Sequence, residues 1–249
     1  MEQRKNKIYF ASDFHLGNSS REENQRKEKL ILRWLNHISK DAEEIYLLGD
    51  IFDFWFEYKH VVPKGYVRFL GTLATLVDSG VRIHFFCGNH DLWLIDYFQE
   101  ELGLIVHKEK ELVSLYGKTF MIGHGDGLDS KDKKYKFINT IFKNKICIKA
   151  FASLHPRWAI ALGESWSKSS RSSHSESDKN DLAEKEPIYQ FCIKTLEKQN
   201  IDYFVFGHRH LACNKELKDY SRYINLGYWD TYGYYAEWDG ENLELKKFD

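Results

Sequence analysis

Five short polar motifs constrain this sequence more than any other feature, because each directly follows an apolar run typical of a β-strand. The motifs are Asp13–His15, Gly49–Asp53, Gly88–Asp91, Gly123–Asp126 and Gly207–His210. In an open α/β sheet, ligands bind beyond the carboxyl ends of the strands, so loops in these positions can converge on one place. Glycine beside the polar residue in four of them permits tight turns and close backbone approach. The sequence therefore predicts one polar site built from five strand ends.

The N-terminal part alternates between strand and helix patterns. Ile8–Ser12, Glu44–Leu48 and Val81–Phe86 are apolar runs of strand length, and residues 22–39 and 64–78 between them place apolar side chains at helical spacing. Strands that alternate with helices imply right-handed βαβ crossovers. We therefore expect a sheet that is at least partly parallel.

The later strand patterns include two hairpins. Paired runs flank short turns at Gly117–Lys118 and Asp239–Gly240, which are hairpin signals. The strands expected in this part are Glu111–Tyr116, Thr119–Ile122, Tyr203–Phe206, Arg222–Asn225, Tyr234–Trp238 and Asn242–Phe248. A parallel half followed by antiparallel hairpins predicts an α/β fold with two sheets or one mixed sheet.

Residues 127–190 differ in composition, and we interpret them as a helical cap inserted into a single domain that spans residues 1–249. The window 131–171 holds ten basic and two acidic residues, a net charge of +8, which leaves −9 for the rest of a chain whose total is −1. Helices are expected over 132–163, with a break near Pro156, and the Ser-rich residues 167–177 are expected to form a loop. Basic helices with interleaved apolar residues are typical of membrane interfaces; a solvated helical surface is the alternative.

Composition excludes several classes of protein. A hydrophobic fraction of 43% is enough for a sizeable core and excludes global disorder. No apolar run approaches the roughly 18–20 residues of a transmembrane helix. We expect no signal peptide, because Met1–Lys7 contains no apolar segment and leads straight into a strand. The four cysteines lack CxxC spacing and are interpreted as reduced thiols of a cytoplasmic protein.

The polar residues of the five motifs are of the types that bind metals. Imidazole, carboxylate and amide oxygen suit Mn²⁺, Fe²⁺ or Zn²⁺, and the absence of thiolates argues against a structural zinc. Residues i and i+2 of an extended segment point the same way, so Asp13 with His15, or His208 with His210, can supply two ligands. Asp50 could bridge two ions, and ions about 3.5–4 Å apart are common in phosphate-ester hydrolysis. Any one motif alone could be an ordinary turn or a set of buried structural side chains, but the five together favour a metal site.

With all five motifs in order over residues 13–210, the sequence resembles the calcineurin-like metallophosphoesterases, whose pattern is DxH, GDxxD, GNH(D/E), a later His and GHxH. The resemblance implies a sandwich of two β-sheets flanked by helices, with a dinuclear, usually manganese, centre. It implies that one ion is held by Asp13, His15, Asp50 and His210. It implies that the other is held by Asp50, Asn89, His124 and His208.

Within that superfamily the sequence is most similar to the UDP-2,3-diacylglucosamine hydrolases of lipid A biosynthesis. The similarity includes residues 8–15, 47–55, 124–126 and 226–229, and the position and basic, apolar character of the cap. It implies hydrolysis of the pyrophosphate of UDP-2,3-diacylglucosamine to UMP and 2,3-diacylglucosamine 1-phosphate, with the acyl chains enclosed by the cap. A lipid substrate must leave a bilayer, so we expect a cytoplasmic protein bound peripherally to the inner membrane.

The same resemblance implies a set of substrate-contacting residues: Asn89, His90, Asp132, Ser167, Arg171, His174 and His208. The hydrolases typically have Arg where this chain has His90, the residue of the wider superfamily, which leaves another substrate open. In the cap, Arg171 and His174 replace an Asn and a Lys, while Ser167 is kept. Both replacements can donate hydrogen bonds to a phosphate or sugar. Asp132 is matched to a substrate-contacting aspartate of the hydrolases only by its spacing in the sequence from His124.

We hypothesise that His90 and Asp50 are catalytic. Metal-bound hydroxide would attack the phosphorus nearest the nucleoside, while both ions and His90 stabilise charge on the phosphoryl oxygens. Asp53 and Asp91 are interpreted as residues that orient ligand histidines or the His90 ring. The alternative for both is an ordinary turn or helix-cap aspartate.

Other functions stay open at this stage. The first is another calcineurin-like phosphodiesterase or phosphatase acting on a nucleotide or other phosphoester. The second is a non-catalytic interaction scaffold, although such scaffolds tend to lose ligands and every expected ligand is present here. Nucleic-acid binding through the basic cap lacks a supporting motif and is not expected. The sequence does not determine the oligomeric state.

Overall fold

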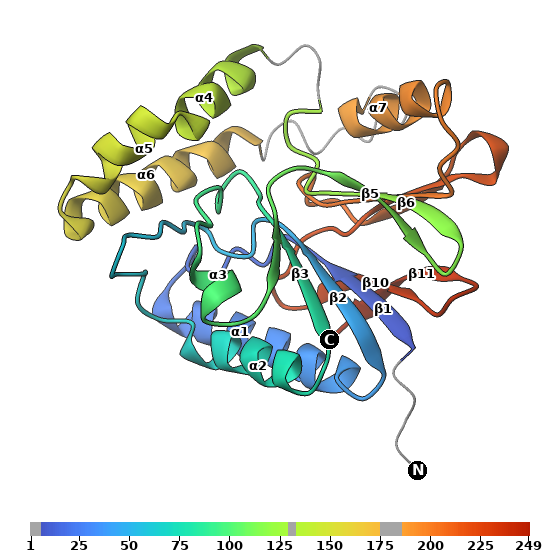
Figure 1. Ribbon diagram of the computed structural model, residues 1–249, viewed down its shortest axis with the longest axis horizontal. Coiled ribbons are helices and arrows are strands. Elements are labelled where there is room, and N and C mark those ends of the chain that lie inside the picture. Colours follow the sequence, from blue (N-terminus) through green and yellow to red (C-terminus); the bar gives the residue numbers. More distant parts are fainter. Residues whose placement is uncertain (1–5, 129–132, 175–185) are drawn as a thin grey trace.

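The computed structural model of the protein describes residues 6–128, 133–174 and 186–249. Two β-sheets pack face to face, with helices on the outside (Figure 1). The first sheet has the order β11-β10-β1-β2-β3-β4, in which β1 to β4 are parallel and β10 and β11 are antiparallel additions. Its strands are β1 (Lys7–Ala11), β2 (Ala42–Leu48), β3 (Arg82–Phe86), β4 (Ile105–His107), β10 (Gly233–Trp238) and β11 (Leu243–Phe248).

The second sheet has the order β5-β6-β7-β9-β8. β6, β7 and β9 are parallel, while β5 and β8 pair antiparallel at the two edges. The strands are β5 (Glu111–Leu115), β6 (Lys118–Ile122), β7 (Tyr203–Phe206), β8 (Cys213–Glu216) and β9 (Arg222–Asn225). The expectation of two sheets flanked by helices is therefore confirmed.

The helices form three groups (Figure 1). α1 (Arg21–Ile38) and α2 (Val67–Asp78) cover the outer face of the first sheet, with the short α3 (Tyr97–Glu100) beside them. α7 (Pro187–Leu196) covers the second sheet, where a short 3₁₀ turn, η1 (Lys218–Tyr220), also lies. α4 (Lys133–Lys143), α5 (Lys145–Ala152) and α6 (Pro156–His174) lie together beyond the ends of the strands.

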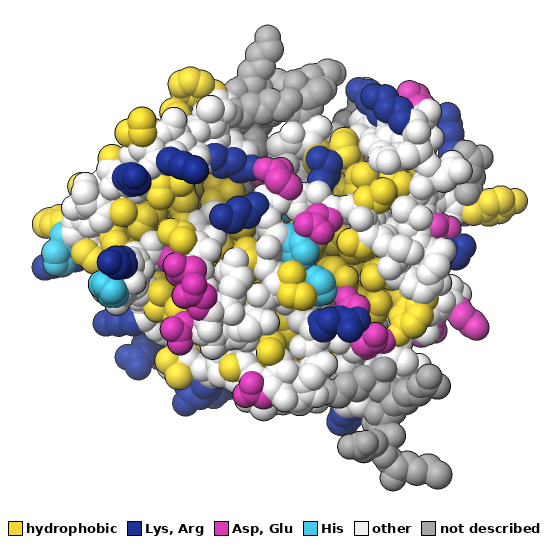
Figure 2. Space-filling view, viewed as in Figure 1, with side chains coloured by type: hydrophobic (Ala, Val, Ile, Leu, Met, Phe, Trp, Pro, Cys, Tyr) yellow, Lys and Arg dark blue, Asp and Glu magenta, His cyan; other side chains and the backbone are white. Residues whose placement is uncertain are grey.

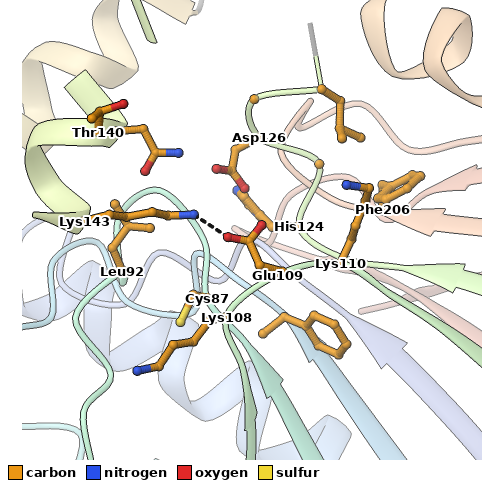
Figure 3. A pocket seen from close by; sticks show the side chains of 15 residues that line it. Cys87, Leu92, Lys108, Glu109, Lys110, His124, Asp126, Thr140, Lys143 and Phe206 are labelled. Carbon is orange, nitrogen blue, oxygen red and sulfur yellow. Dashed lines mark hydrogen bonds and ion pairs between the residues drawn. The ribbon is translucent and has the colours of Figure 1, made fainter. Parts of the chain in front are cut away.

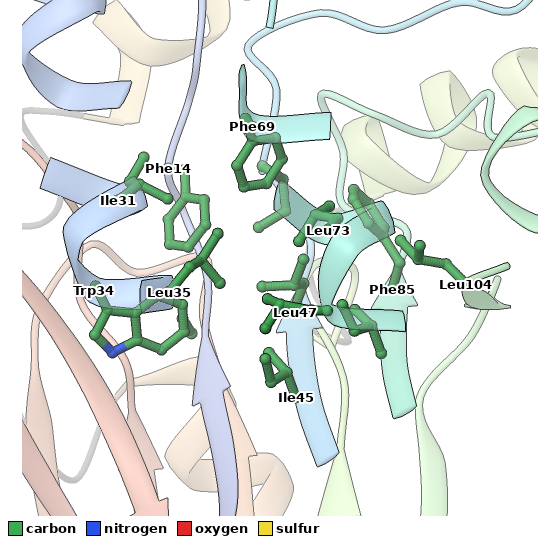
Figure 4. Close-up of a cluster of buried hydrophobic side chains, with 14 of the residues drawn as sticks. Phe14, Ile31, Trp34, Leu35, Ile45, Leu47, Phe69, Leu73, Phe85 and Leu104 are labelled. Atoms are coloured by element: carbon green, nitrogen blue, oxygen red, sulfur yellow. The ribbon is translucent and has the colours of Figure 1, made fainter. Parts of the chain in front are cut away.

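The helices of the first sheet are fixed by local sequence as well as by burial. The Ser20 hydroxyl accepts a hydrogen bond from the Glu23 N–H while the Glu23 carboxylate accepts one from the Ser20 N–H, a capping box that starts α1. Phe14 and Trp34 belong to the cluster of buried side chains between the sheet and α1 and α2 (Figure 4). Trp229, also fully buried, packs with its ring centroid 5.0 Å from Phe14. This core supports the loops that follow β1 and β2.

Three expectations about helices need correction. The helix expected from residue 64 starts at Val67, because Gly65 and Tyr66 both have positive φ. The loop expected over 167–177 is wrong for residues 167–174, which continue α6. That stretch is Ser-rich but contains no glycine or proline to end a helix, and serine is only a weak helix former. α7, whose first residues fall in the segment interpreted as the cap, packs on the second sheet instead. All four cysteines are free thiols.

Candidate metal centre

The loops that follow β1, β2, β3, β6 and β7 carry the five motifs, and they meet at one end of the two sheets. Backbone hydrogen bonds join neighbouring loops. The Asp13 N–H donates to the Gly49 carbonyl at 3.1 Å, and the Gly207 N–H donates to the His124 carbonyl at 2.9 Å. The structure thus brings together side chains that lie up to 197 positions apart, from Asp13 to His210.

Asp13, His15, Asp50 and His210 form a first cluster, in which one potential ligand atom from each lies within 4.8 Å of the others. Nε2 of His15 lies 3.1 Å from Nε2 of His210 and 3.6 Å from Oδ2 of Asp50. Nε2 of His210 lies 3.2 Å from Oδ1 of Asp13. This is the first of the two ligand sets that the sequence resemblance implies.

Asp50, His124 and His208 form a second cluster at the same spacing. Nε2 of His124 lies 3.3 Å from Oδ2 of Asp50 and 3.3 Å from Nδ1 of His208. Oδ1 of Asn89 lies 3.2 Å from the same His124 nitrogen. Asp50 belongs to both clusters, so a single carboxylate lies where two ions would share a ligand.

The hydrogen bonds of two histidines show that this donor set fits a metal. Nδ1 of His124 lies 2.8 Å from the Leu48 carbonyl, and Nδ1 of His15 lies 3.3 Å from the Asp53 carboxylate. Nδ1 therefore carries the proton, as it commonly does in histidines that bind metals through Nε2. In the neutral rings, the Nε2 lone pairs of His15 and His124 therefore face other atoms that carry lone pairs, Nε2 of His210 and Oδ2 of Asp50. A cation between them would remove that repulsion, and carboxylate, imidazole and amide oxygen suit divalent metals.

Interactions among the clustered residues shift the pKa values of His15, His124 and Asp50 in the direction that favours the charged form of each side chain. Burial opposes charge on His124, but the neighbouring Asp50 carboxylate raises the pKa of His124 well above its ordinary value. Burial also opposes charge on His15, yet hydrogen bonds to Asp13 and Asp53 raise the pKa of His15 to about 9. Burial alone would raise the pKa of Asp50, whereas the histidine charges, His124 first, hold it well below its ordinary value. The cluster therefore stabilises positive charge beside Asp50.

The two further aspartates of the motifs differ in what they contact. Asp53 lies 3.3 Å from a ring nitrogen of His15, in agreement with an orienting contact. The Asp91 carboxylate instead accepts backbone N–H bonds, from Gly88 at 2.7 Å and from Ile51 at 2.8 Å. These bonds tie the loop after β2 to the loop after β3.

His90 lies at the edge of both clusters. Its Nε2 is 4.0 Å from Oδ2 of Asp50, and its Nδ1 is 2.6 Å from the hydroxyl of Ser167. That hydroxyl donates to the Asp53 carbonyl at 2.6 Å, so its oxygen accepts from Nδ1–H of His90. Burial lowers the pKa of His90. Ser167 is itself 1% exposed, so α6 of the cap holds the His90 ring directly.

The backbone around the site is unusual. The following residues of the motifs have left-handed φ angles although they are not glycine: Asp13 (56°), His15 (43°), Asp50 (51°), His208 (70°) and His210 (54°). A Cβ atom added at Gly88 would lie 2.2 Å from Oδ1 of Asp50, so this glycine is required for the close approach of the two loops. Such conformations cluster at functional sites.

Sequence reasoning missed Tyr228, whose ring centroid lies 5.1 Å from that of His210 and 5.8 Å from that of His15. Its hydroxyl accepts a hydrogen bond from Lys27 at 3.0 Å. The only signal was its position in the short segment 226–229. Among the residues expected to contact substrate, Asp132 lies outside the described residues, as do the side chains of Arg171 and His174.

Among the described residues, an apolar pocket and a polar pocket open beside the clusters, and α4 contributes to the walls of both. The apolar pocket, with a volume of about 360 Å³, is lined by Phe54, Trp93, Ile141, Phe142, Cys147, Ile148, Phe151, Leu162, Gly163 and Trp166. It adjoins His90, whose ring centroid is 6.4 Å from that of Trp166. The polar pocket, of about 310 Å³, has His124 in its wall. Histidine and acidic side chains reach the surface near the middle of the face in Figure 2, with basic and hydrophobic side chains of the cap helices beside them.

Comparison with known proteins gives a family match, full-length relatives and structural neighbours. The family model described as calcineurin-like phosphoesterase matches residues 6–212. A UDP-2,3-diacylglucosamine hydrolase of Porphyromonas gingivalis is 40% identical over 98% of this chain and 98% of its own length. A protein of the same name from Pseudomonas fluorescens is 28% identical over 97% of this chain and 95% of its own. A solved archaeal phosphodiesterase is 15% identical, with a TM-score of 0.49 over 97% of this chain and 98% of that one.

Proposed function

The chain belongs to the calcineurin-like phosphoesterase family, and we propose that it hydrolyses the pyrophosphate of UDP-2,3-diacylglucosamine to UMP and 2,3-diacylglucosamine 1-phosphate. Full-length relatives carry the name of that activity. The observation that carries the proposal is the apolar pocket, which lies beside His90. A soluble phosphoester needs no such pocket, whereas a diacylated one does.

We propose Asp13, His15, Asp50 and His210 as ligands of one Mn²⁺ ion. We propose Asp50, Asn89, His124 and His208 as ligands of a second. When bound, such ions lower the pKa of a coordinated water and neutralise charge on phosphoryl oxygens. The carboxylate and imidazole donors support Mn²⁺, because they suit it and no thiolate is among them.

The chain's own groups would position the phosphate. Nδ1 of His90 is held by the Ser167 hydroxyl at 2.6 Å and by the Asp53 carbonyl at 3.0 Å. Nε2 is thereby directed toward Asp50, where the protonated ring would donate to a phosphoryl oxygen. The Asp53 carboxylate keeps the proton of His15 on Nδ1, so its Nε2 stays a ligand. We therefore propose that Ser167 acts on catalysis through His90, as a positioning residue, rather than by touching substrate.

We propose α4, α5 and α6 as the cap and the apolar pocket as the acyl-chain site. The pocket is lined by aromatic and aliphatic side chains from the cap and by Phe54, which follows Asp53 in the loop after β2. Trp93 donates a hydrogen bond from its indole to the Phe142 carbonyl at 3.0 Å, which fixes α4 over the loop after β3. A pocket of this size and composition is typical of small-molecule sites.

Filling the apolar pocket tests the acyl-chain assignment. Ile148→Trp places a larger ring among the pocket side chains, so kcat/KM for the diacylated substrate is expected to fall by about tenfold or more, since a misplaced apolar group costs about 1–3 kcal/mol. Ile146→Trp on the same helix is the control, because Ile146 is 77% exposed and does not line the pocket. Cleavage of bis(p-nitrophenyl) phosphate should be unchanged in both. An Ile148→Trp variant with normal kcat/KM for the lipid would contradict the assignment.

Mass spectrometry of the products tests the reaction itself. Incubation of the Mn²⁺-loaded protein with UDP-2,3-diacylglucosamine should give UMP and the lipid 1-phosphate, with ¹⁸O from labelled water on the UMP. The runner-up is a phosphodiesterase or phosphatase for another nucleotide, favoured by His90 where the hydrolases have Arg. Faster turnover of UDP-sugars or free nucleotides in a parallel panel would establish that alternative instead.

We propose that the cap also docks on the cytoplasmic face of the inner membrane. It exposes large apolar side chains, Phe137 at 69%, Ile146 at 77%, Trp158 at 65% and Leu162 at 57%. Leu162 also lines the apolar pocket, so the pocket and the exposed surface are continuous. Basic side chains interleave with them, which suits an anionic leaflet. Of the helices in the described residues, none is long and apolar enough to cross a bilayer.

Vesicle binding checks this docking. Trp158→Ala is expected to weaken co-sedimentation with vesicles that contain anionic phospholipid by about tenfold, because a buried aromatic side chain contributes about 1.5–3 kcal/mol. Tyr220, which is 91% exposed, belongs to η1 between β8 and β9 and not to the cap helices, so Tyr220→Ala is the control. Equal binding of the two variants would rule out a membrane contact at Trp158.

A further inference from the structure

His210 differs from His15 and His124 in how its ring is held. Hydrogen bonds from Nδ1 to a carboxylate and to a backbone carbonyl orient the rings of His15 and His124. Among the described residues, Nδ1 of His210 has no such hydrogen bond, and the polar contacts of this ring are made by Nε2. The His210 side chain is also 29% exposed, whereas that of His15 is fully buried. A ligand ring without an orienting hydrogen bond needs packing to keep its nitrogen directed at an ion.

The ring of Tyr228 supplies that packing. Its centroid lies 5.1 Å from that of His210, with 35° between the two ring planes, and 5.8 Å from that of His15. The rings of His15 and His210 meet edge to face, with centroids 5.0 Å apart. Aromatic rings at such separations attract one another. The His210 ring is therefore packed against Tyr228 as well as against His15.

Tyr228 is itself fixed at both ends. The next residue, Trp229, is fully buried and donates its backbone N–H to the Asp13 carbonyl at 3.3 Å. At the other end, the Tyr228 hydroxyl accepts hydrogen bonds from Lys27 at 3.0 Å and from the side-chain amide of Asn18 at 2.8 Å. Lys27 also donates to Oδ1 of Asn18 at 3.1 Å, so the three side chains are joined in a triangle of hydrogen bonds.

Lys27 makes this tether strong. The residue belongs to α1 and is 2% exposed, and its Nζ lies 4.8 Å from the centre of the Tyr228 ring. Burial of an ammonium group is costly unless its N–H groups are hydrogen bonded. Hydrogen bonds from a charged donor are roughly twice as strong as those between neutral groups. The tyrosine ring therefore has little freedom to move away from His210.

The second cluster is supported separately. Nδ1 of His124 lies 2.8 Å from the Leu48 carbonyl, and His124 lines the polar pocket (Figure 3). The ring contacts of Tyr228 with ligand histidines are to His15 and His210, which both belong to the first cluster. Loss of the Tyr228 ring is therefore expected to affect the two ion sites unequally.

We propose that Tyr228 is a positioning residue, which holds His210 in place for the ion of the first cluster. It acts through that histidine and not by contact with the ion or the substrate. Lys27 and Asn18 serve the same purpose, because they hold the tyrosine. This inference rests on the two ion sites of the proposed function, but it does not depend on which substrate is cleaved.

Calorimetry of Mn²⁺ binding tests the inference without turnover, in two backgrounds that each leave one ion site intact. His208→Ala removes a ligand of the second site. In that background, Tyr228→Leu should weaken the retained ion about tenfold or more, the usual effect of losing a residue that orients a metal ligand. His210→Ala removes a ligand of the first site. There, Tyr228→Leu should leave the Kd of the retained ion unchanged, because the histidine through which Tyr228 acts is already absent.

Two further substitutions in the His208→Ala background identify the part of Tyr228 that matters. Tyr228→Phe keeps a ring against His210 but loses the hydrogen bonds of the hydroxyl, so its Kd should lie between those of the parent and of Tyr228→Leu. Tyr232→Leu is the control and should have no effect, because Tyr232 is 41% exposed and belongs to neither cluster. Circular dichroism of each variant verifies that loss of binding is not loss of fold.

The outcomes separate this inference from the proposed metal centre. An unchanged Kd on adding Tyr228→Leu to His208→Ala would overturn the inference and leave both ion sites in place. Equal weakening in the two backgrounds would also overturn it, since that result indicates a general effect on the fold. A loss in Tyr228→Phe as large as in Tyr228→Leu would overturn the role given to the ring. An unmodified protein that binds no Mn²⁺ would refute the metal centre, and this inference with it.

Discussion

Asp50→Asn is expected to lower kcat by at least about 10³-fold, because a ligand shared by two ions contributes several kcal/mol of transition-state stabilisation. The substitution is conservative in shape. Asparagine tolerates the left-handed φ of 51° and keeps an oxygen that can accept the His90 N–H, now at 2.9 Å. What it removes is the negative charge beside His15 and His124.

The measurement combines turnover of a chromogenic phosphodiester with metal content by mass spectrometry. The unmodified protein should retain close to two divalent ions per chain, and Asp50→Asn fewer. Asp230→Asn is the control, because that carboxylate is exposed and lies 3.8 Å from an exposed arginine, Arg26. Full activity and full metal content in Asp50→Asn would show that the clusters around it are not the metal centre.

Trp229→Ala is expected to reduce the free energy of unfolding by about 3–5 kcal/mol, the usual range for a large aromatic side chain removed from a core. The Trp229 ring is fully buried, with centroids 5.0 Å from Phe14 and 5.3 Å from Trp34. Its indole also donates to the Tyr234 carbonyl at 2.9 Å, so truncation leaves that acceptor without its donor. This loss is a large fraction of the stability of an ordinary domain.

Urea denaturation of the metal-free protein measures the effect without the contribution of bound ions. Trp158→Ala supplies the matched tryptophan control, since Trp158 is 65% exposed and surface substitutions usually change stability by about 0.5 kcal/mol or less. If Trp229→Ala unfolded at nearly the same urea concentration as Trp158→Ala, the core described around Phe14 would be wrong.

The ends of the strands could be predicted from the sequence, because the apolar run and the polar motif that follows it are neighbours in the chain. An apolar run followed by a polar residue with glycine predicts where the loops after β1, β2 and β3 start. Parallel pairing then places those loops at one edge of a sheet, so the convergence of Asp13 and Asp50 follows without knowledge of the packing. The two-sheet architecture followed from the same patterns together with the resemblance.

The remaining features depend on contacts between distant segments. The bond between Ser167 and His90 joins residues 77 positions apart, and it requires α6 to run across the loop after β3. A Ser-rich stretch gives no hint of that contact, and it led to the wrong expectation of a loop. Asp53 and Asp91 look alike in sequence, but only the packing decides that one contacts a histidine and the other backbone N–H groups. The burial of the Asn139 side-chain oxygen likewise depends on where α4 packs.

The left-handed backbone of the candidate ligands has a consequence for directed evolution. Each such non-glycine residue costs about 1–3 kcal/mol relative to a relaxed conformation. Glycine at any of the five positions would relieve that strain, so variants selected only for resistance to heat are expected to accumulate changes that destroy the site. Thermostable versions of this protein should therefore be sought under simultaneous selection for turnover, with the metal-site loops kept out of the mutated region.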